Sequence, residues 1–463
     1  MTPLPPKRAS RGDVFSAFPI LGFLASFRSQ ASIPDRMAGA KVSPAAFAEA
    51  KPRLLQRVGF WMLCAYGVSG LANDWALRLF GSKAYLSTIA LLSIPILWLL
   101  SGTSLRGLRH PIGRWWLAFL VWLALATPLS VWKGGSAAML WDFVPRSYML
   151  FFYTAALVTS LRYCRFLMYA NIFAALGTLL VCIIWGTYSN DARFYVPGQE
   201  AGLATMSNSN FVALSLLMGA TSYIYLLYQR GAVKKSIAIA GIGISIVYML
   251  KTGSRGCMLA AFAWAVVFLV LTPRWRAFLP LSLAAAAGLW ALPSTTLSRL
   301  GQWGDGPDGG AEGSRQWRIE ILKRSLRETA EHPFFGVGPD QFVVQIAAEG
   351  KEKGGWEPAL GTHNSYTQVS SECGIPALIF YCSVILLCLS MNYRMFKITR
   401  NNPESTETAA LSLSLLSGIV VYAVCNFFFH MAYTGTLPAI AGFTLALHNA
   451  SRPILRKDAG FRL

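Results

Sequence analysis

Long apolar runs alternate with short basic or polar segments along most of this chain. Each run has about 15 to 22 residues, close to the length that an α-helix needs to cross the hydrocarbon core of a bilayer. The runs lie at 58–73, 84–102, 115–132, 147–161, 166–187, 211–228, 236–250, 256–272, 277–293, 374–391, 409–429 and 431–449. The pattern predicts an all-α, polytopic integral membrane protein with about 12 transmembrane helices.

The segments between the runs differ in charge, and this difference predicts the orientation of the chain. When the N-terminus is placed in the cytoplasm, every segment on the inner side is basic, as the positive-inside rule requires. The outer segments carry equal numbers of acidic and basic residues. We therefore expect both termini in the cytoplasm and the long segment between the ninth and tenth runs in the periplasm of a bacterial inner membrane.

The composition agrees with a membrane protein. Hydrophobic residues make up 54% of the chain and charged residues only 13%, whereas roughly a quarter of the residues of a soluble domain are charged. The net charge of +20 taken alone would suggest a nucleic-acid-binding protein. Because the excess of positive charge lies on the inner side, it reflects membrane insertion, and we expect membrane lipids and no nucleic acid as partners.

The runs and their spacing divide the chain into five parts. The Pro-, Ala- and Ser-rich composition of the N-terminal part predicts a disordered tail. We do not expect a cleaved signal peptide there, because cleavage would leave the new N-terminus outside, against the charge pattern. The parts are 1–53 for this basic cytoplasmic tail, 54–293 for transmembrane helices 1–9, 294–372 for a periplasmic loop, 373–450 for transmembrane helices 10–12, and 451–463 for a cytoplasmic tail.

The periplasmic loop is too long to be a simple connector, so we expect it to carry functional residues. Its Gly- and Asp-rich opening at 301–314 predicts an irregular segment. An amphipathic helix is predicted at about 314–331, with Ser314 as its N-cap and His332-Pro333 at its end. At 100° per residue, its apolar side holds Arg315, Arg318, Ile319, Leu322 and Leu326. The opposite side carries Lys323, Arg324 and Arg327 together with glutamates, and we expect ion pairs there.

Three residues on the predicted outer side have the chemistry of a transfer site. His363 precedes the tenth run, and an imidazole with a pKa near 6.5 can take a proton from a hydroxyl at neutral pH. Arg255 stands between glycines at the start of the eighth run, and with Arg318 it offers two guanidinium groups suited to phosphate. The alternatives are an interfacial or capping histidine and a snorkelling arginine. Those alternatives are favoured for His430 and His110.

Metal and nucleotide motifs are absent from the sequence. There is no HExxH motif, no carboxylate cluster with metal spacing and no GxSxG motif, so we expect neither a metal nor a cofactor. Gly336-Val337-Gly338 is followed by proline and predicts a turn. Asp142, Arg146 and Glu372 lie near outer helix ends, where charged residues are usually ion pairs or snorkelled groups.

Several segments, in order, resemble the bacterial O-antigen ligase and polymerase superfamily. They are Thr252-Gly253-Ser254-Arg255-Gly256, Arg318, His332-Pro333-Phe334-Phe335-Gly336-Val337-Gly338, His363-Asn364-Ser365-Tyr366 and Glu372-Cys373-Gly374-Ile375-Pro376. Asn208-Ser209-Asn210 after the Arg193 loop resembles a weaker family segment. Leu322 departs from the family, which commonly has Trp at that position, and leaves Arg315 as an alternative to Arg318.

The resemblance implies a GT-C-like membrane glycosyltransferase. Such proteins move a glycan from an undecaprenyl diphosphate carrier to a lipid or saccharide acceptor hydroxyl, by a metal-independent, inverting transfer. On this chain Arg255 and Arg318 would hold the diphosphate and His363 would act as general base. The family's substrate-binding positions correspond to Arg315, Arg193, Asn210, Asn364 and Tyr366.

Three alternatives remain open from the sequence. A Wzy-type O-antigen or exopolysaccharide polymerase differs from a ligase only in its acceptor, and no residue here decides between them. A small-anion or lipid transporter would be expected to show internal repeats and midplane charges, and neither is evident. A structural scaffold leaves the set of Arg255, Arg318 and His363 unexplained.

Overall fold

A computed structural model describes residues 54–80, 86–100, 104–189, 193–197, 208–272, 310–352 and 361–458. The chain divides into two units, Met1–Lys51 and Pro52–Leu463, and all of these residues lie in the second. The predicted N-terminal tail, the predicted ninth transmembrane helix at 277–293 and the first part of the predicted periplasmic loop lie outside the described residues.

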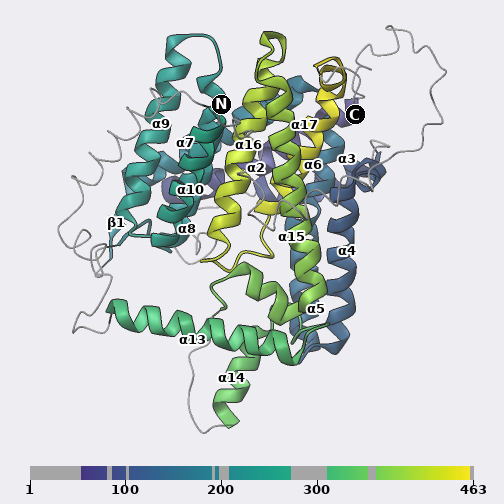
Figure 1. The fold of residues 1–463 in the computed structure, drawn as a ribbon, viewed down its shortest axis with the longest axis vertical. Helices are drawn as coiled ribbons and strands as arrows, with labels where there is room; N and C mark the ends of the chain where they lie inside the picture. The colour runs from purple at the N-terminus through teal and green to yellow at the C-terminus, as the bar shows by residue number, and fades with distance from the viewer. Residues whose placement is uncertain are drawn as a thin grey trace, which may run out of the picture. The chain divides into compact units, whose positions relative to one another are not determined.

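Helices dominate the described part of the chain (Figure 1). Their bounds are α2 (Leu54–Phe80), α3 (Leu86–Leu100), α4 (Pro111–Ala126), α5 (Lys133–Phe143), α6 (Leu150–Leu157), α7 (Leu161–Trp185), α8 (Ser209–Leu227), α9 (Ala232–Lys251), α10 (Arg255–Leu271), α13 (Gly310–Glu331), α14 (Phe342–Glu352), α15 (Ser365–Thr399), α16 (Thr406–Cys425) and α17 (Thr436–Asp458). Short 3-10 turns lie at Ser104–Arg109, Thr127–Leu129 and Pro403–Ser405, and a π-helical turn lies at Val144–Tyr148. Two short strands, β1 (Thr187–Tyr188) and β2 (Phe194–Tyr195), pair antiparallel with Thr187 opposite Tyr195. The predicted all-α class is confirmed.

Six helical segments within the described residues are long and apolar enough to cross a membrane. They are Pro111–Leu129, Leu161–Trp185, Ser209–Leu227, Ala232–Lys251, Ser365–Thr399 and Pro403–Cys425, and Arg255–Leu271 is a shorter apolar helix. The chain is therefore a membrane protein of the all-α class. The number of twelve spans and the cytoplasmic placement of the termini stay predictions.

Polar side chains cap several of these helices where an apolar run begins. His110 Nδ1 accepts from the N–H of Ile112 at 3.3 Å at the start of α4, so the capping interpretation of this histidine is confirmed. Ser160 caps α7 in the same way. Such caps satisfy backbone N–H groups that have no partner in the first turn of a helix, and they fix the residue at which each helix begins.

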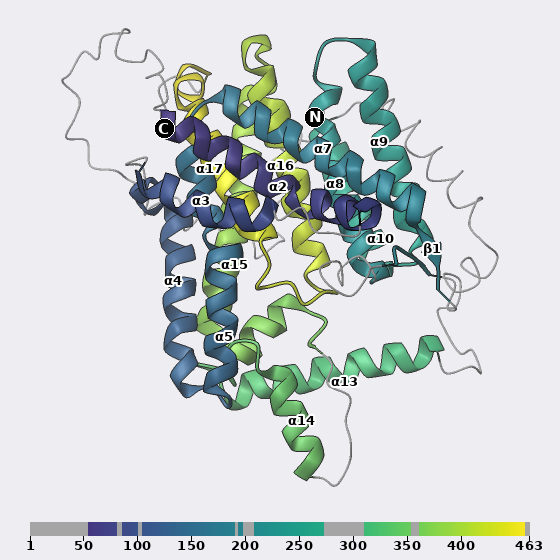
Figure 2. The ribbon, with the colours of Figure 1, turned by 180° about the vertical axis from the view of Figure 1, so that it is seen from behind.

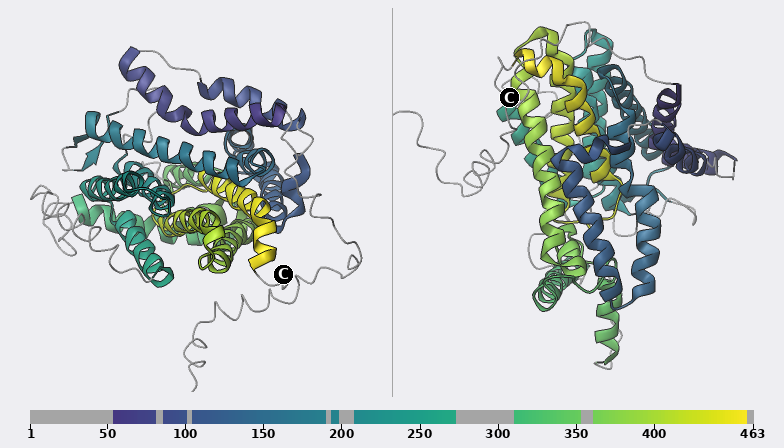
Figure 3. Two further views of the ribbon diagram at one scale, coloured as in Figure 1. Left: turned by 90° about the horizontal axis from the view of Figure 1, so that it is seen from above. Right: turned by 90° about the vertical axis from the view of Figure 1, so that its right-hand side faces the viewer.

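The bundle is arranged around α15 and α16. α15 packs against α4, α16, α17 and α13, and α16 packs against α8 and α10. Seen from above, α3, α2, α7 and α8 follow one another across the bundle, in agreement with their packing (Figure 3, left). α4 and α5 run side by side toward the end of the bundle where α13 lies crosswise (Figure 2). α14 extends away from the bundle at that end (Figures 1 and 2).

α15 is broken near its start, and the break is filled by other segments. Gly374 has non-helical angles (φ 82°, ψ 174°) and Pro376, which has no N–H, follows it. The freed backbone groups are satisfied by the turn after α13: Val337 N–H donates to Ser371 O at 2.9 Å, and Ile375 N–H donates to Pro333 O at 2.7 Å. The predicted turn in this region is confirmed, and it braces the break in α15.

Some predicted boundaries differ from the structure. α13 begins at Gly310, so Ser314 lies inside the helix and is not its N-cap, and the predicted irregular segment ends earlier than expected. Ala311 and Glu312 favour this earlier start, because a carboxylate near a helix N-terminus interacts favourably with the helix dipole. α5 and α14 have 11 residues each and were not predicted, because neither contains an apolar run of spanning length.

Candidate functional site

The turn before α15 holds His363 in an uncommon backbone conformation. Its φ of 49° lies in the left-handed region, which costs a residue other than glycine roughly 1–2 kcal/mol. The next residue, Asn364, accepts hydrogen bonds at Oδ1 from the N–H groups of Tyr366 at 2.9 Å and Thr367 at 3.2 Å. Because this cap sets the start of α15, it also fixes the position of His363 relative to the helix.

Ser365 ties this turn to the loop between α16 and α17. Its hydroxyl donates to Phe429 O at 2.7 Å and accepts from the N–H of Met431 at 2.8 Å. Phe429 and Met431 flank residue 430 on both sides. These hydrogen bonds therefore hold His430 beside His363, although the two residues lie far apart in the sequence.

The rings of His363 and His430 meet edge to face, with centroids 5.3 Å apart and an interplanar angle of 77°. Burial lowers the pKa of His363 to about 4, and the positive charges of protonated His430 and of Arg318 act in the same direction. Burial also lowers the pKa of His430. Both rings are therefore neutral at pH 7, and each neutral imidazole has one nitrogen that can accept a proton.

Arg318 of α13 acts on the first histidine of this pair through its charge. Its guanidinium acts electrostatically on His363, and α13 packs against α15. The side chain is exposed, so its positive charge is accessible to a ligand. The structure thus brings together two of the three residues that the sequence singled out for chemistry. Arg315 belongs to the first part of α13, where only the backbone is described.

The face of α13 that packs inward differs from the predicted one. Ile321 is 4% exposed and packs with Phe342 and Ile346 of α14, whereas Ile319 and Leu326 are 42% and 52% exposed. The predicted apolar side, which contains Ile319 and Leu326, is therefore wrong as a description of packing, and the buried Ile321 does not belong to it. The packing face of α13 includes the polar Ser325 and Glu328, which hydropathy alone does not identify. The predicted charged side is confirmed by ion pairs of Arg324 with Glu320 at 3.2 Å and of Arg327 with Glu331 at 3.8 Å.

Arg255 is the first residue of α10 and is exposed. The following Gly256 allows α10 to approach Phe428 closely, since a Cβ on Gly256 would lie 2.7 Å from the Cβ of Phe428. Phe428 belongs to the same loop as His430. The α16–α17 loop therefore contacts both the start of α10 and the turn that holds His363.

Arg193 and Asn210, both predicted to bind substrate, contact each other. Arg193 Nη2 donates to Asn210 Oδ1 at 2.6 Å, and its Nε donates to Thr252 O at 3.3 Å. Thr252 lies in the turn that precedes Arg255. Arg193 thereby links the start of α8 to this turn, and it lies with Asn210 near the start of α10.

The polar groups of Asn364 and Tyr366 make hydrogen bonds to the backbone of the protein itself. Asn364 Oδ1 caps α15, and the Tyr366 hydroxyl donates to Ala423 O at 2.8 Å. Their substrate-binding roles stay predictions, and the structure adds a structural role to each. Both roles are compatible for Asn364, whose amide N–H groups are separate from its capping oxygen.

The side chain of Glu372 is buried and contacts other segments of the chain, so it does not lie exposed at a helix end. It is 3% exposed, its Oε2 accepts from Asp340 N–H at 3.1 Å, and it accepts a hydrogen bond from the Tyr433 hydroxyl. The interpretation of this carboxylate as an exposed ion pair or snorkelled group is wrong. No local signal identifies its partner, because Tyr433 lies in the α16–α17 loop. By contrast, Asp142 and Arg146 do form an ion pair, at 2.6 Å.

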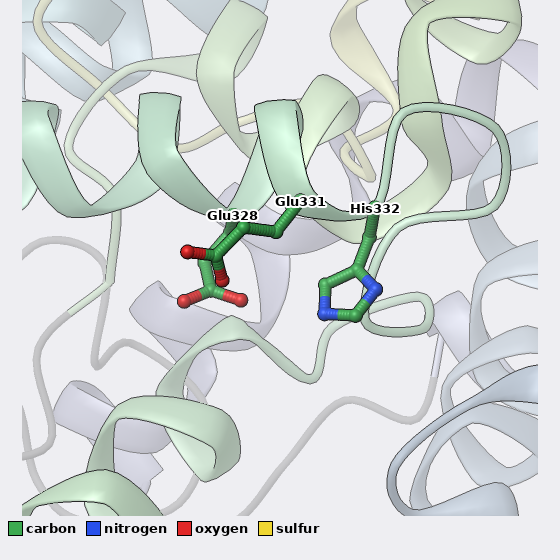
Figure 4. Close-up of side chains that lie close together, drawn as sticks. All are labelled: Glu328, Glu331 and His332. Atoms are coloured by element: carbon green, nitrogen blue, oxygen red, sulfur yellow. The ribbon is translucent and has the colours of Figure 1, made fainter.

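Glu328, Glu331 and His332, at the end of α13, have the atom types of a metal site. Their nearest ligand atoms lie within 4.8 Å of one another, and the three side chains project to the same side of the helix (Figure 4). Arg327 already lies among the carboxylates, 2.7 Å from Glu349 and 3.5 Å from Glu328. Burial, followed by the nearby Glu349, raises the pKa of Glu328 to about 7. The guanidinium of Arg327 supplies the positive charge that a metal cation would bring. We therefore interpret these residues as an ion-pair network.

The fold and these contacts define an all-α membrane protein with a histidine pair on which Arg318 of α13 acts electrostatically. The sequence model of the O-antigen ligase family matches residues 240–382, a segment that contains Arg255, Arg318 and His363. This match confirms the resemblance to the O-antigen ligase and polymerase superfamily. No curated protein matches the sequence.

Proposed function

We propose that this protein is a membrane glycosyltransferase that moves a glycan from an undecaprenyl diphosphate carrier to an acceptor hydroxyl at the periplasmic face. The observation that carries the proposal is the electrostatic effect of Arg318 on a neutral, strained His363, within the segment that matches the O-antigen ligase family. A phosphate-binding cation beside a proton acceptor is what transfer from a diphosphate to a hydroxyl requires.

His363 is the proposed general base. As the acceptor oxygen attacks the anomeric carbon, its proton passes to the free nitrogen of His363, and the bond from that carbon to the phosphate oxygen breaks. The electron pair of that bond leaves with the diphosphate. A pKa of about 4 makes His363 by itself a weak base. A bound diphosphate would offset the charge of Arg318 and raise the pKa of His363, so the base would be strongest when the donor is present.

Arg255 and Arg318 are the proposed diphosphate ligands. Guanidinium groups bind phosphate oxygens with paired hydrogen bonds and keep their charge at any physiological pH. They would stabilise the charge that develops on the leaving diphosphate, a task for which other transferases use a metal ion. Arg193 supports this arrangement by its hydrogen bond to Thr252 beside Arg255. We propose that the reaction needs no metal.

An O-antigen or exopolysaccharide polymerase is the second candidate. It would use the same donor and the same three residues, and would differ in taking a growing glycan as the acceptor. The description of the matching family as O-antigen ligase favours the first candidate. Glycan profiles of a deletion strain separate the two: unattached long chains on the carrier indicate a ligase, whereas single-repeat products indicate a polymerase.

The proposal is tested with purified full-length protein, an undecaprenyl diphosphate oligosaccharide and a candidate acceptor, with and without a chelator. We expect transfer in both conditions, and its loss in the variants Arg255→Ala, Arg318→Ala and His363→Ala. Lys323→Ala is the matched control, because Lys323 is an exposed cation on the same helix as Arg318. Wild-type transfer by His363→Ala would refute the general-base role, and loss of transfer on chelation would refute metal independence.

A further inference from the structure

The second histidine of the site, His430, lies outside the segment that matches the ligase family. Its position follows from the backbone: Ser365 bonds to the residues on both sides of it, Phe429 and Met431, at 2.7 and 2.8 Å. Gly361 lies against its ring, because a Cβ there would be 3.4 Å from three ring atoms of His430. The turn at 361–363 therefore packs against this ring on the side of Gly361 and His363.

The surroundings of His430 differ from those of a surface histidine. The side chain is exposed, yet burial by surrounding protein lowers the pKa of the ring. The ring packs against Gly361 and His363, and the side chain is still accessible to a ligand. His363 is half-buried beside it, with the ring centroids 5.3 Å apart.

We infer that His430 is a positioning residue for the general base: its ring holds the imidazole of His363 edge-on, in the orientation that receives the proton of the acceptor hydroxyl. The inference rests on the proposed function, because it assigns a second residue to the same proton transfer. His363 has a left-handed backbone and its ring needs a rigid neighbour to keep one orientation, which the flanking hydrogen bonds of His430 supply. A base that is misplaced by about 1 Å can lose about 100-fold in rate.

The charged groups that act on His363 are Arg318 of α13 and His430 of the α16–α17 loop. The His430 ring lies beside that of His363, and its positive charge when protonated lowers the pKa of His363. Its removal would therefore let the pKa of His363 rise toward the ordinary value near 6.5, and a base with a higher pKa becomes protonated at higher pH. The acid limb of the pH profile should move upward. A residue that only supports the fold would lower activity at every pH without moving this limb.

The test measures kcat, KM for the donor, and the pH dependence of kcat/KM between pH 4 and pH 8 for His430→Ala and His430→Phe. For His430→Ala we expect a loss of about 10- to 100-fold in kcat, little change in KM, and an acid limb at higher pH. Phenylalanine keeps a ring of similar size against His363, so His430→Phe should recover most of the rate and insert normally. The matched control is His448→Phe, because His448 faces His110 in a second pair, at 5.8 Å, that contains none of the proposed site residues.

The outcomes separate this inference from the proposed function. Wild-type kcat and an unmoved acid limb in His430→Ala would overturn the positioning role. An equal loss at all pH values in both His430 variants would also overturn it, since that is the result of a purely structural role. Wild-type transfer by His363→Ala would refute the general-base role on which this inference rests. If His363→Ala is inactive and the His430 variants have wild-type kinetics, only the positioning role of His430 is refuted.

Discussion

Substitution of Gly374 by alanine tests whether the break in α15 needs a glycine. The residue has φ 82° and ψ 174°, a region that is almost restricted to glycine and costs other residues roughly 1–3 kcal/mol. A Cβ there would also overlap the carbonyl oxygen of Phe334. The displaced turn would weaken two hydrogen bonds, from Ile375 N–H to Pro333 O at 2.7 Å and from Trp122 Nε1 to Phe334 O at 3.0 Å. Each weakened hydrogen bond costs about 1 kcal/mol. Added to the backbone strain, the two bonds bring the expected loss of stability to about 3–5 kcal/mol.

Gly231→Ala is the matched control. Gly231 also has a positive φ, 107°, but a Cβ there would have no neighbour within 4 Å. It therefore carries the backbone strain without the steric overlap or the lost hydrogen bonds, and we expect it to cost about 2 kcal/mol less than Gly374→Ala. Both variants are compared by the apparent melting temperature of the detergent-solubilised protein. Equal melting temperatures for the two variants would refute the argument that the turn after α13 braces α15.

Four further predictions address the site and the contacts around it. The pH profile of kcat/KM in the wild type should be flat from pH 8 down to about pH 5 and fall toward pH 4, because the pKa of His363 is lowered to about 4 and its neutral form persists above that value. Arg318→Ala should raise that pKa, which the pH dependence of histidine acylation by diethyl pyrocarbonate would show; an unchanged dependence would contradict the electrostatic effect of Arg318. Gly256→Val should force α10 away from Phe428, lowering melting temperature and transfer together, whereas normal values for both would disprove the close approach. Tyr433→Phe should destabilise the protein by about 1–3 kcal/mol, since a buried carboxylate of α15 loses its hydroxyl donor, and an unchanged melting temperature would speak against this bond.

The sequence predicted those parts of the fold that depend on local pattern. Apolar runs of spanning length correspond to α7, α8, α9, α15 and α16, because the period of hydrophobic residues and the cost of burying charge in a bilayer act within one segment. α5 and α14 carry no such signal. Both are short helices whose stability comes from packing, and α14, for example, buries Phe342 and Ile346 against Ile321.

Those parts of the candidate site whose chemistry depends on single residue types could be predicted from the sequence. His363, Arg255 and Arg318 stood out through residue type, predicted membrane side and order along the chain. The partnership of His363 with His430 was not predictable, since it depends on the hydrogen bonds of Ser365 to a loop more than one helix away. The burial of Glu372 depends in the same way on Tyr433. One sequence does not reveal contacts of this kind.

The break in α15 explains why these long-range contacts matter for chemistry. The short first part of the helix, Ser365–Cys373, begins two residues after His363, and Gly374 separates it from the rest of α15. A segment joined to the helix by such a break would not hold the proposed base steady unless other elements fixed it. Trp122 of α4 donates to Cys373 O at 3.0 Å, the turn after α13 donates to Ser371 O and Glu372 O, and the α16–α17 loop bonds to Ser365. Because these contacts fix the segment from three directions, a change at Gly374 should act mainly on stability, whereas a change at His430 should act mainly on proton transfer.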